Sequence, residues 1–544
     1  MSNKMIPSEE DESHVNLLPD DSSSIPSREA TDDSVGSLRN RSGTAIANKN
    51  NAGGNESIVD ANQSHAPAAE TSFISVVSEA TSIAKEVVSP GAGGIYASAL
   101  LMIKAVLGIG WIAIATSARM LGGGVVSAII ICIAVGGYFS TAFIAECCIK
   151  SKSWSYEEMV RSCVPGNKTR KCFGFLTSGM LIFNQMGVLV AYAIMIAELL
   201  NILISDRQGN TILLKGFWNT NGVELGTFIM PFLIFIFVTP FSLLKDLNLI
   251  RHFVILAVFS MVFMVITLAY IIIRYGVEKS SIKNAGTPWG VDSGSLDFWI
   301  SLNAITAVIF GLKFQQHLPK IVSEMSDRTI HTAKVTGAYA NTVGAIITLT
   351  LALLGLYAFG WGPGPEFVQN LREFTSGDGA TNRAYQRDVI VWIATILVVL
   401  STACGYLIQA FTLRNSCNSI VKRIRGVPRN LPDSDDRQVP IPIFGTYKIG
   451  LGRLLDLIIA VVLQIICIII ALVANSFMSV VHYMGAIMGS YIMFWGPGLF
   501  VLFARAKYDA EFNLLSPGNW LPIAFVPVGL FIMVLGTIAA AKVS

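Results

Sequence analysis

The sequence contains little charge. Only 14% of its 544 residues are charged, whereas 53% are hydrophobic, and a soluble domain carries about 25% charged residues. Its mean hydropathy is +0.58. The formal net charge is only +3, and no run rich in Lys and Arg is interleaved with aromatic residues, which argues against a nucleic-acid partner. The composition predicts a membrane protein with many apolar spans.

Sequences that mark enzymes are also missing. No Walker A, G-x-S-x-G or H-E-x-x-H sequence occurs; these mark phosphate-binding loops, hydrolase nucleophiles and zinc peptidases. The adjacent Cys147 and Cys148 lack metal-ligand spacing and a nearby histidine, so we interpret them as small residues that pack helices. The sequence therefore predicts no enzyme, no ATP-driven pump, no cofactor and no metal site.

The first 90 residues differ from the rest of the chain. Residues 1–71 are rich in Ser, Asp, Asn and Gly, and with so little apolar content we expect a disordered tail. No apolar stretch follows Met1, so we expect the first span to act as the insertion signal. Residues 72–88 fit an amphipathic helix and a partly ordered linker about equally well. We predict a cytosolic tail over 1–90 and a transmembrane domain over 91–544.

Continuously apolar runs divide the remainder of the chain. Each is near the roughly 20 residues that cross the hydrocarbon core of a bilayer, and none alternates with the period of a barrel strand. We therefore predict an all-α membrane protein with eleven transmembrane helices. The expected spans are 96–119, 123–148, 173–204, 225–243, 251–275, 297–324, 330–360, 387–413, 453–474, 476–503 and 519–541.

Lysine and arginine are spread unevenly over the predicted loops. Six lie between positions 150 and 171 and eight between positions 414 and 453, whereas three follow the fifth span and none follows the ninth. Positively charged loops stay in the cytosol. This pattern predicts a cytosolic N-terminus and an external C-terminus. For the location, we favour the plasma membrane over a vacuolar or lysosomal membrane.

The first and the sixth predicted spans each contain glycine beside lysine. These elements are Lys104 with Gly108-Ile109-Gly110, and Phe310-Gly311-Leu312-Lys313. Unwound backbone at membrane depth is tolerated only where it lines a cavity or is buried in protein. Two interrupted spans at matching places are a sequence pointer to a transporter's substrate site. Close helix packing through small residues is the alternative explanation.

Several segments resemble motifs of the amino acid/auxin permease family, and in particular its protist members in the APC superfamily. The matching segments are 108–115 (GIGWIAIA, compared with G-x-G-x-L-x-L-P), 155–159 (SYEEM, compared with TYxEL), 187–192 followed by Glu198 (GxxxxY…D), 239–247 (TPFSLLKDL, compared with lPLsllrdl), and Gln315 followed by Glu324-Met325 (CQ…P…EM). By the order and spacing of these motifs, residues 95–540 are identified as a member of the family.

The resemblance implies the fold of the bacterial leucine transporter. In that fold two inverted five-helix repeats place discontinuous first and sixth helices around a site at the membrane midplane. Two departures from the family pattern stand out in this sequence. Ala115 replaces the first-span proline, and Lys104 and Lys313 stand where small or neutral residues are more frequent.

An amino acid brings a carboxylate and an ammonium, and two broken helices can satisfy both. The N–H groups and positive dipole end of a half-helix suit the carboxylate, and free carbonyls at the break accept from the ammonium. We place the carboxylate near Gly108, Ile109 and Gly110. The substrate-binding region for the side chain is expected near Phe310, Gly311, Leu312 and Lys313.

Lys104 and Lys313 are the sharpest candidates for a functional charge, because intramembrane charges are costly and functional by default. In one interpretation, a lysine ammonium occupies the place where sodium binds in other members of the family, and transport is then sodium-independent. A second pairs one lysine with an acidic substrate. The third is an internal ion pair with Glu198 or Glu146 that holds helices together.

Four further residues are candidates with open alternatives. Tyr192 either covers the substrate, offering an apolar wall and a donor, or packs between helices. Ser401 and Thr402 suit a sodium site with first-span carbonyls, or bond back to their own helix. His317 is a candidate for proton coupling.

These observations favour a secondary active transporter of amino acids that works by alternating access. Its expected partners are an amino acid, a proton or sodium as coupling ion, and membrane lipid. We expect sodium-independent transport, either proton-coupled or by exchange. The alternative is a sensor that binds an amino acid in the same cavity without transporting it.

Overall fold

The structure is a computed structural model of the whole chain. It describes residues 98–99, 102–103, 108–204, 248–278, 298–360, 367, 370–371, 374, 388–424, 438–440, 448–474 and 476–543. All of them belong to one compact unit, Pro67–Ser544. Four subjects of prediction lie outside the described residues: the tail over 1–90 with its stretch 72–88, the fourth span 225–243, the family-like motif 239–247, and Lys104.

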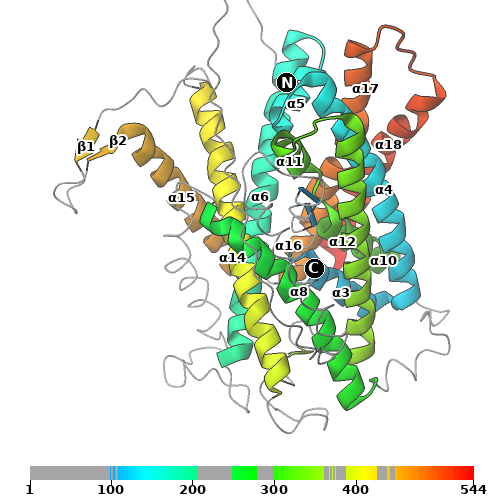
Figure 1. Cartoon of the computed structure of the whole chain (residues 1–544), viewed down its shortest axis with the longest axis vertical. Coiled ribbons are helices and arrows are strands. Elements are labelled where there is room, and N and C mark those ends of the chain that lie inside the picture. The colour runs from blue at the N-terminus through cyan, green and yellow to red at the C-terminus, as the bar shows by residue number, and fades with distance from the viewer. Residues whose placement is uncertain are drawn as a thin grey trace, which may run out of the picture. The chain divides into compact units, whose positions relative to one another are not determined.

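The described part of the chain consists almost entirely of helices. The long ones are α4 (Gly123–Ser151), α6 (Asn167–Ile204), α8 (Asn248–Tyr275), α12 (Ile330–Phe359), α14 (Val389–Ile424), α15 (Leu451–Val473) and α18 (Pro517–Val543). A short antiparallel hairpin, β1 (Gln438–Pro440) and β2 (Lys448–Gly450), lies between α14 and α15 in the chain. The predicted all-α architecture is confirmed for the long elements (Figure 1).

Within the described residues, eight helical segments are long and apolar enough to cross a membrane. They correspond to eight of the eleven predicted spans, with bounds that differ by a few residues. The ninth predicted span corresponds to the shorter apolar helix Leu457–Val473. The first is described only in part, by α3 (Gly110–Leu121). The eight segments agree with the prediction in position, and the full number of eleven goes beyond the described residues.

Both predicted interruptions are present. In the first span Gly108 and Ile109 form a bend and a turn, and α3 begins at Gly110. In the sixth, α10 (Phe298–Leu312) ends one residue after Gly311. Lys313 and Phe314 are not helical, and a 3₁₀ turn, η2 (Gln315–His317), leads into α11 (Leu318–Glu324).

The two broken helices touch through their glycines. A Cβ atom on Gly110 would lie 2.9 Å from the backbone nitrogen of Gly311 and would overlap its Cα. No side chain larger than hydrogen fits there. Both explanations given for the glycines therefore apply. They lie at the helix interruptions, and they let two backbones pack in direct contact.

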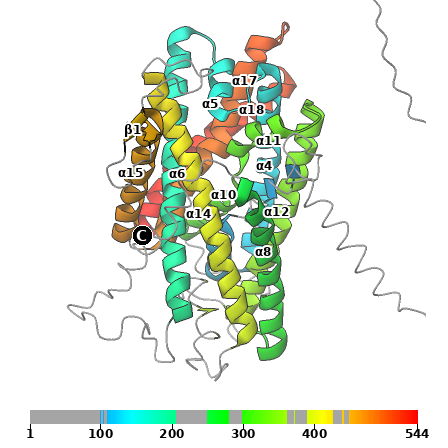
Figure 2. The same cartoon turned by 60° about the vertical axis from the view of Figure 1, so that its left-hand side comes forward.

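The most enclosed spans lie at the centre of the bundle. In the most apolar 18-residue stretch of each segment, 72% of the residues of 298–324 and 78% of those of 477–508 are buried, against only 33% for 517–542. The central span 477–508 is built from α16 (Phe477–Met484), two π-helical turns, η3 (Gly485–Gly489) and η4 (Tyr491–Trp495), and α17 (Gly496–Tyr508). Around the centre, α14 packs along α6 and α8, and α12 packs along α4 (Figures 1 and 2).

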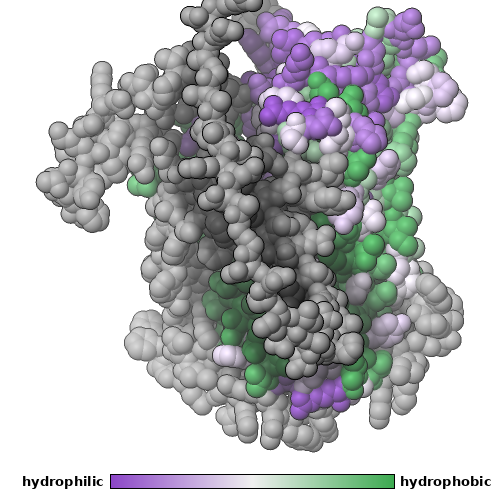
Figure 3. Space-filling view, in the orientation of Figure 1, coloured by the Kyte–Doolittle hydropathy of each residue, from purple (hydrophilic) through white to green (hydrophobic). Residues whose placement is uncertain are grey.

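Large apolar side chains cover the outward faces of the peripheral helices. Ile131, Phe175, Ile266 and Phe531 are all more than half exposed. In Figure 3 hydrophobic residues cover the flank, and hydrophilic ones gather at the end where α17 and α5 (Tyr156–Cys163) lie. Exposed apolar surface of this extent suits lipid rather than water.

The hydrophilic end is held by a network of charged side chains. Glu146 of α4 receives two hydrogen bonds from Arg505 of α17, at 2.8 and 2.7 Å, and an ion pair from Lys150 at 3.0 Å. Arg505 also donates to the Gly518 carbonyl at 2.8 Å. Lys150 in turn contacts Asp509 at 2.7 Å. Glu146 is buried, so it joins helices here rather than extending toward the membrane surface.

Candidate functional site

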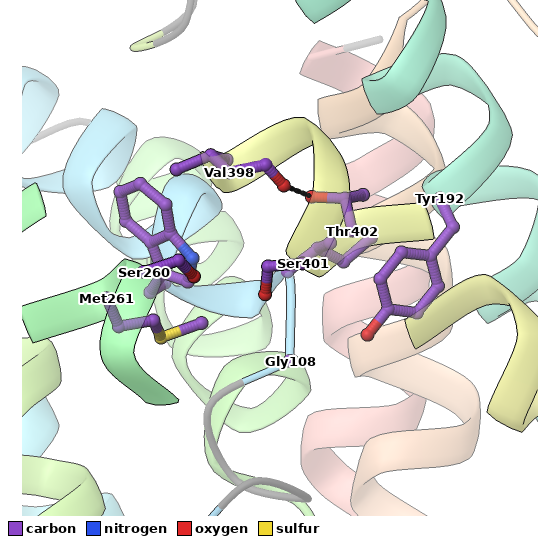
Figure 4. Close-up of a pocket in the computed structure, with 9 residues that line it drawn as sticks. Gly108, Tyr192, Ser260, Met261, Val398, Ser401 and Thr402 are labelled. Carbon is purple, nitrogen blue, oxygen red and sulfur yellow. Dashed lines mark hydrogen bonds between the residues drawn. The ribbon is translucent and has the colours of Figure 1, made fainter. Parts of the chain in front are cut away.

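A small pocket opens at the interruption in the first span. Nine residues from four helical segments line it: Gly108, Ile109 and Trp111 at the start of α3, Tyr192 of α6, Ser260 and Met261 of α8, and Val398, Ser401 and Thr402 of α14. Figure 4 shows these side chains around Gly108. Of the predicted site residues, the structure brings Gly108, Ile109, Tyr192, Ser401 and Thr402 together here.

Tyr192 reaches the interruption with its hydroxyl. That hydroxyl lies beside the backbone at the break: a Cβ atom on Gly108 would lie 3.4 Å from it, and the backbone N–H of Ile109 is close by. Its ring lies against α14, where a Cβ on Gly405 would meet the ring at 2.7 Å. Gly405 therefore makes the room that brings the phenol to the pocket. In Figure 4 the hydroxyl points toward Gly108.

The start of α3 offers hydrogen-bond donors to the pocket. The first N–H groups of a helix have no partner within the helix, and its dipole is positive at that end. Ile109 precedes α3 and no side chain caps it. Gly108 and Gly110 add no side chain that would cover these amides. A carboxylate is the group that such a helix start binds best.

The hydroxyl groups of α14 have different partners. Thr402 donates to the carbonyl oxygen of Val398 at 2.6 Å (Figure 4), the back-bonding that the sequence left open. Ser401 is nearly buried and lines the pocket; its hydroxyl makes no hydrogen bond to any residue that the structure describes. On the facing helix, Ser260 donates to the Ala257 carbonyl at 2.8 Å. Of the two α14 hydroxyl groups in the pocket wall, Ser401 is therefore the one that is available to a ligand.

The second interruption contacts the first but does not line the pocket. Phe310, Gly311 and Leu312 are buried, and Gly311 contacts Gly110 from the side of α10. None of these residues lines the pocket, and neither does Lys313. The second break therefore touches the first through Gly311 and Gly110, while its residues do not line this pocket.

Lys313 is a buried cation, 7% exposed, with neutral partners. Its ammonium donates to Asn184 Oδ1 at 2.5 Å and lies 4.4 Å from the centre of the Phe310 ring. Among the described residues no carboxylate pairs with it. The alternative of an ion pair with Glu146 or Glu198 is therefore not found for Lys313.

The remaining candidates lie away from the pocket. Asn184 Nδ2 donates to Gln316 Oε1 at 2.9 Å, and the Gln316 amide contacts His317 Nε2 at 3.0 Å. His317 is thus the end of a polar chain that begins at Lys313. Glu198 is half-buried on α6, six residues beyond Tyr192, and does not line the pocket.

Sequence reasoning missed four of the pocket residues. Trp111 directly follows the predicted Gly108-Ile109-Gly110 segment, and its position alone could have indicated it. Val398 lies one helical turn before Thr402 and could have been inferred from it. Ser260 and Met261 lie in an apolar span that has no break or charge near them. No sequence signal distinguishes them.

Comparison with known families agrees with this geometry. The family described as transmembrane amino acid transporter protein matches residues 91–542. A bundle of membrane-length helices with a pocket at a broken helix agrees with a membrane transporter. The chain belongs to the transmembrane amino acid transporter family.

Two solved structures are similar to this chain. MhsT in complex with L-phenylalanine has a TM-score of 0.50 at 15% identity, over 81% of this chain and 98% of that chain. A manganese transporter of Eremococcus coleocola, bound to an aromatic bis-isothiourea substituted compound, has a TM-score of 0.46 at 13% identity, over 82% and 85%. No curated protein sequence gives a significant match. The likeness to MhsT supports the predicted leucine-transporter-like fold.

Proposed function

We propose that this protein is a secondary active transporter that moves amino acids across a membrane by alternating access. One observation carries the proposal: a pocket lies where the start of α3, free of side chains at Gly108 and Gly110, faces the hydroxyl groups of Tyr192 and Ser401. Membership of an amino acid transporter family supports an amino acid as the ligand.

The two ends of the substrate backbone have different partners in this proposal. The carboxylate binds the N–H groups at the start of α3, near Gly108, Ile109 and Gly110. The ammonium donates to carbonyl oxygens of the unwound backbone and to the Ser401 hydroxyl. Phe310, Gly311, Leu312 and Lys313 shape the site from behind, because Gly311 fixes the position of Gly110.

We further propose that transport does not depend on sodium and is driven by protons or by exchange. Lys104 stands four residues before Gly108. An ammonium about 4 Å from a sodium ion would repel it by about 4 kcal/mol at an effective dielectric of 20. Ser401 and Thr402 supply two neutral oxygens, fewer than a sodium ion needs without the first-span carbonyls. Glu198 and His317 stay as candidates for the proton path.

The orientation and the division of the chain are part of the same proposal. The excess of lysine and arginine between 150 and 171 and between 414 and 453 favours a cytosolic N-terminus. Residues 1–90 would then form a cytosolic tail ahead of the transporter domain 91–544. We favour the plasma membrane as its location.

Uptake into liposomes that contain only the purified protein tests the proposal. Each labelled amino acid is offered with an inward proton gradient, with a sodium gradient, or with unlabelled amino acid inside. We expect saturable uptake of at least one amino acid that sodium does not stimulate. Saturable binding with no flux under all three conditions would instead identify a sensor.

A further inference from the structure

The residues that line the pocket indicate which type of substrate side chain it can hold. None of its nine residues carries a charged side chain. Besides Gly108 and Ile109, the wall is lined by Trp111, Met261 and Val398, together with the hydroxyl-bearing residues Tyr192, Ser260, Ser401 and Thr402. Burying a charged substrate side chain here would leave it without a partner.

Trp111 has a second face that does not belong to the pocket. Its ring meets the ring of Phe367 edge to face, with centroids 5.4 Å apart and planes at 77°. Phe367 comes from the connection between α12 and α14, and it is fully buried. The indole is therefore held between the pocket on one side and Phe367 on the other.

Phe367 is itself fixed by three neighbours. Its backbone N–H donates to the hydroxyl of Thr116 on α3 at 3.2 Å. Its ring lies 5.2 Å from that of Phe359, and a Cβ on Gly355 would lie 2.8 Å from it. The position of the ring is set by α3 and α12 and not by the substrate.

Phe374 provides a comparison within the same connection. It is also fully buried, and its ring contacts those of Phe359, at 6.2 Å, and Tyr275, at 5.1 Å. It is held by the backbone N–H of Asp388, which donates to its carbonyl at 2.8 Å. Phe374 belongs to the same aromatic cluster, but no ring contact joins it to Trp111.

We propose that the pocket takes amino acids with neutral, apolar side chains, and that Trp111, held in place by Phe367, sets the largest side chain accepted. This inference rests on the proposed amino acid site. Trp111 is the specificity-determining residue that touches the substrate, and Phe367 is a positioning residue that acts through it. Trimming Phe367 leaves a void on the outer face of the indole, into which the indole can withdraw.

Competition by alanine, leucine, phenylalanine and tryptophan against a transported substrate tests the proposal in liposomes. The measured quantity is the ratio of apparent affinities for tryptophan and alanine. We expect Trp111→Ala to raise this ratio strongly, and Phe367→Leu to raise it about tenfold, the scale of discrimination by a few methylene groups in an apolar pocket. Lysine and glutamate should compete weakly with every variant.

Phe374→Leu is the matched control. It removes the same atoms from the same aromatic cluster without reaching Trp111, so it should lower stability and leave the affinity ratio unchanged. If Phe367→Leu and Phe374→Leu change all four affinities equally, Phe367 does no more than support the fold. An unchanged ratio in Trp111→Ala would overturn the proposal, and so would strong competition by lysine or glutamate.

The proposed function can fail separately. If wild-type protein transports no amino acid, the same series is measured as ligand-induced shifts in the melting temperature. If the shift depends on the size of the amino acid side chain, and Phe367→Leu weakens that dependence, the pocket assignment is retained and transport is rejected. The absence of any shift with all six amino acids would reject the pocket assignment as well.

Discussion

The two interruptions in this bundle look alike in sequence and differ in structure. At the first, Gly108 and Gly110 leave the backbone bare, and it faces a pocket with a tyrosine hydroxyl opposite. At the second, the chain leaves α10 at Leu312, and Lys313 turns into a buried set of amide side chains. A pocket is present at the first break, whereas amide side chains fill the space beside Lys313 at the second. The comparison indicates that glycine beside lysine marks a break but does not say which break binds.

Replacing Gly110 by Leu should give the largest effect. The added side chain would overlap Gly311 and displace the start of α3, and misplacement of a binding group by about 1 Å can cost about 100-fold. We expect uptake to fall at least about 100-fold while membrane insertion persists. Gly179→Leu on α6, where a Cβ meets nothing within 4 Å, is the control and should transport normally. Normal affinity and uptake in Gly110→Leu would contradict the assignment.

The second break is tested by Lys313→Gln and Lys313→Met. Glutamine can donate to Asn184 Oδ1 in place of the ammonium, whereas methionine leaves that buried oxygen without its donor, which costs about 1–3 kcal/mol. We expect Lys313→Met to be less stable than Lys313→Gln in thermal unfolding, and Lys313→Gln to retain substrate affinity. An equal loss of affinity in both variants, at unchanged stability, would show that the substrate senses the charge at the second break too.

Tyr192→Phe should have a smaller effect at the first break. The variant keeps the ring against Gly405 and loses the hydroxyl that faces the pocket, so the substrate loses one hydrogen-bond partner. One hydrogen bond is worth about 1 kcal/mol, so we expect substrate affinity to fall about fivefold. Tyr138→Phe on the exposed face of α4 serves as the control. Unchanged affinity in Tyr192→Phe would place this tyrosine among the packing residues.

Sodium should have the smallest effect, namely none. Replacing external sodium by choline should leave the initial uptake rate of the wild-type protein unchanged, because under the proposed mechanism the Lys104 ammonium would take the place of the ion. In Lys104→Asn the charge is gone, and sodium should then begin to stimulate uptake. A steep dependence on sodium in the wild-type protein would show that Lys104 points away from the first break.

Features encoded by neighbouring residues were predictable. The interruptions at Gly108–Gly110 and Gly311 follow from the residues themselves, because glycine lowers helix stability locally. Tyr192 was recognisable by its distance from Gly187 in a family motif. The helices themselves follow from long apolar runs, so eight spans agree with the prediction to within a few residues.

Features created by packing between distant segments were not predictable. Glu146 and Arg505 are 359 residues apart in the chain, and nothing local to Glu146 indicates its partner. Met261 enters the pocket only because α8 packs along α14. The separation of Lys313 from the pocket likewise depends on which way the chain leaves α10, and spacing does not determine this.

The two π-helical turns between α16 and α17 determine the rotation of α17 about its axis relative to α16. A π turn closes its hydrogen bond over one more residue than an α turn, and one residue of an α-helix corresponds to about 100° of rotation. η3 and η4 therefore fix which face of α17 looks toward α4, and with it the direction of Arg505. Deleting one residue between 485 and 495 would leave the span apolar and long enough for the bilayer. It would also turn the guanidinium group about 100° away from Glu146. The length of this span and its rotational setting are thus separate properties of the sequence, and only the first is visible in a hydropathy profile.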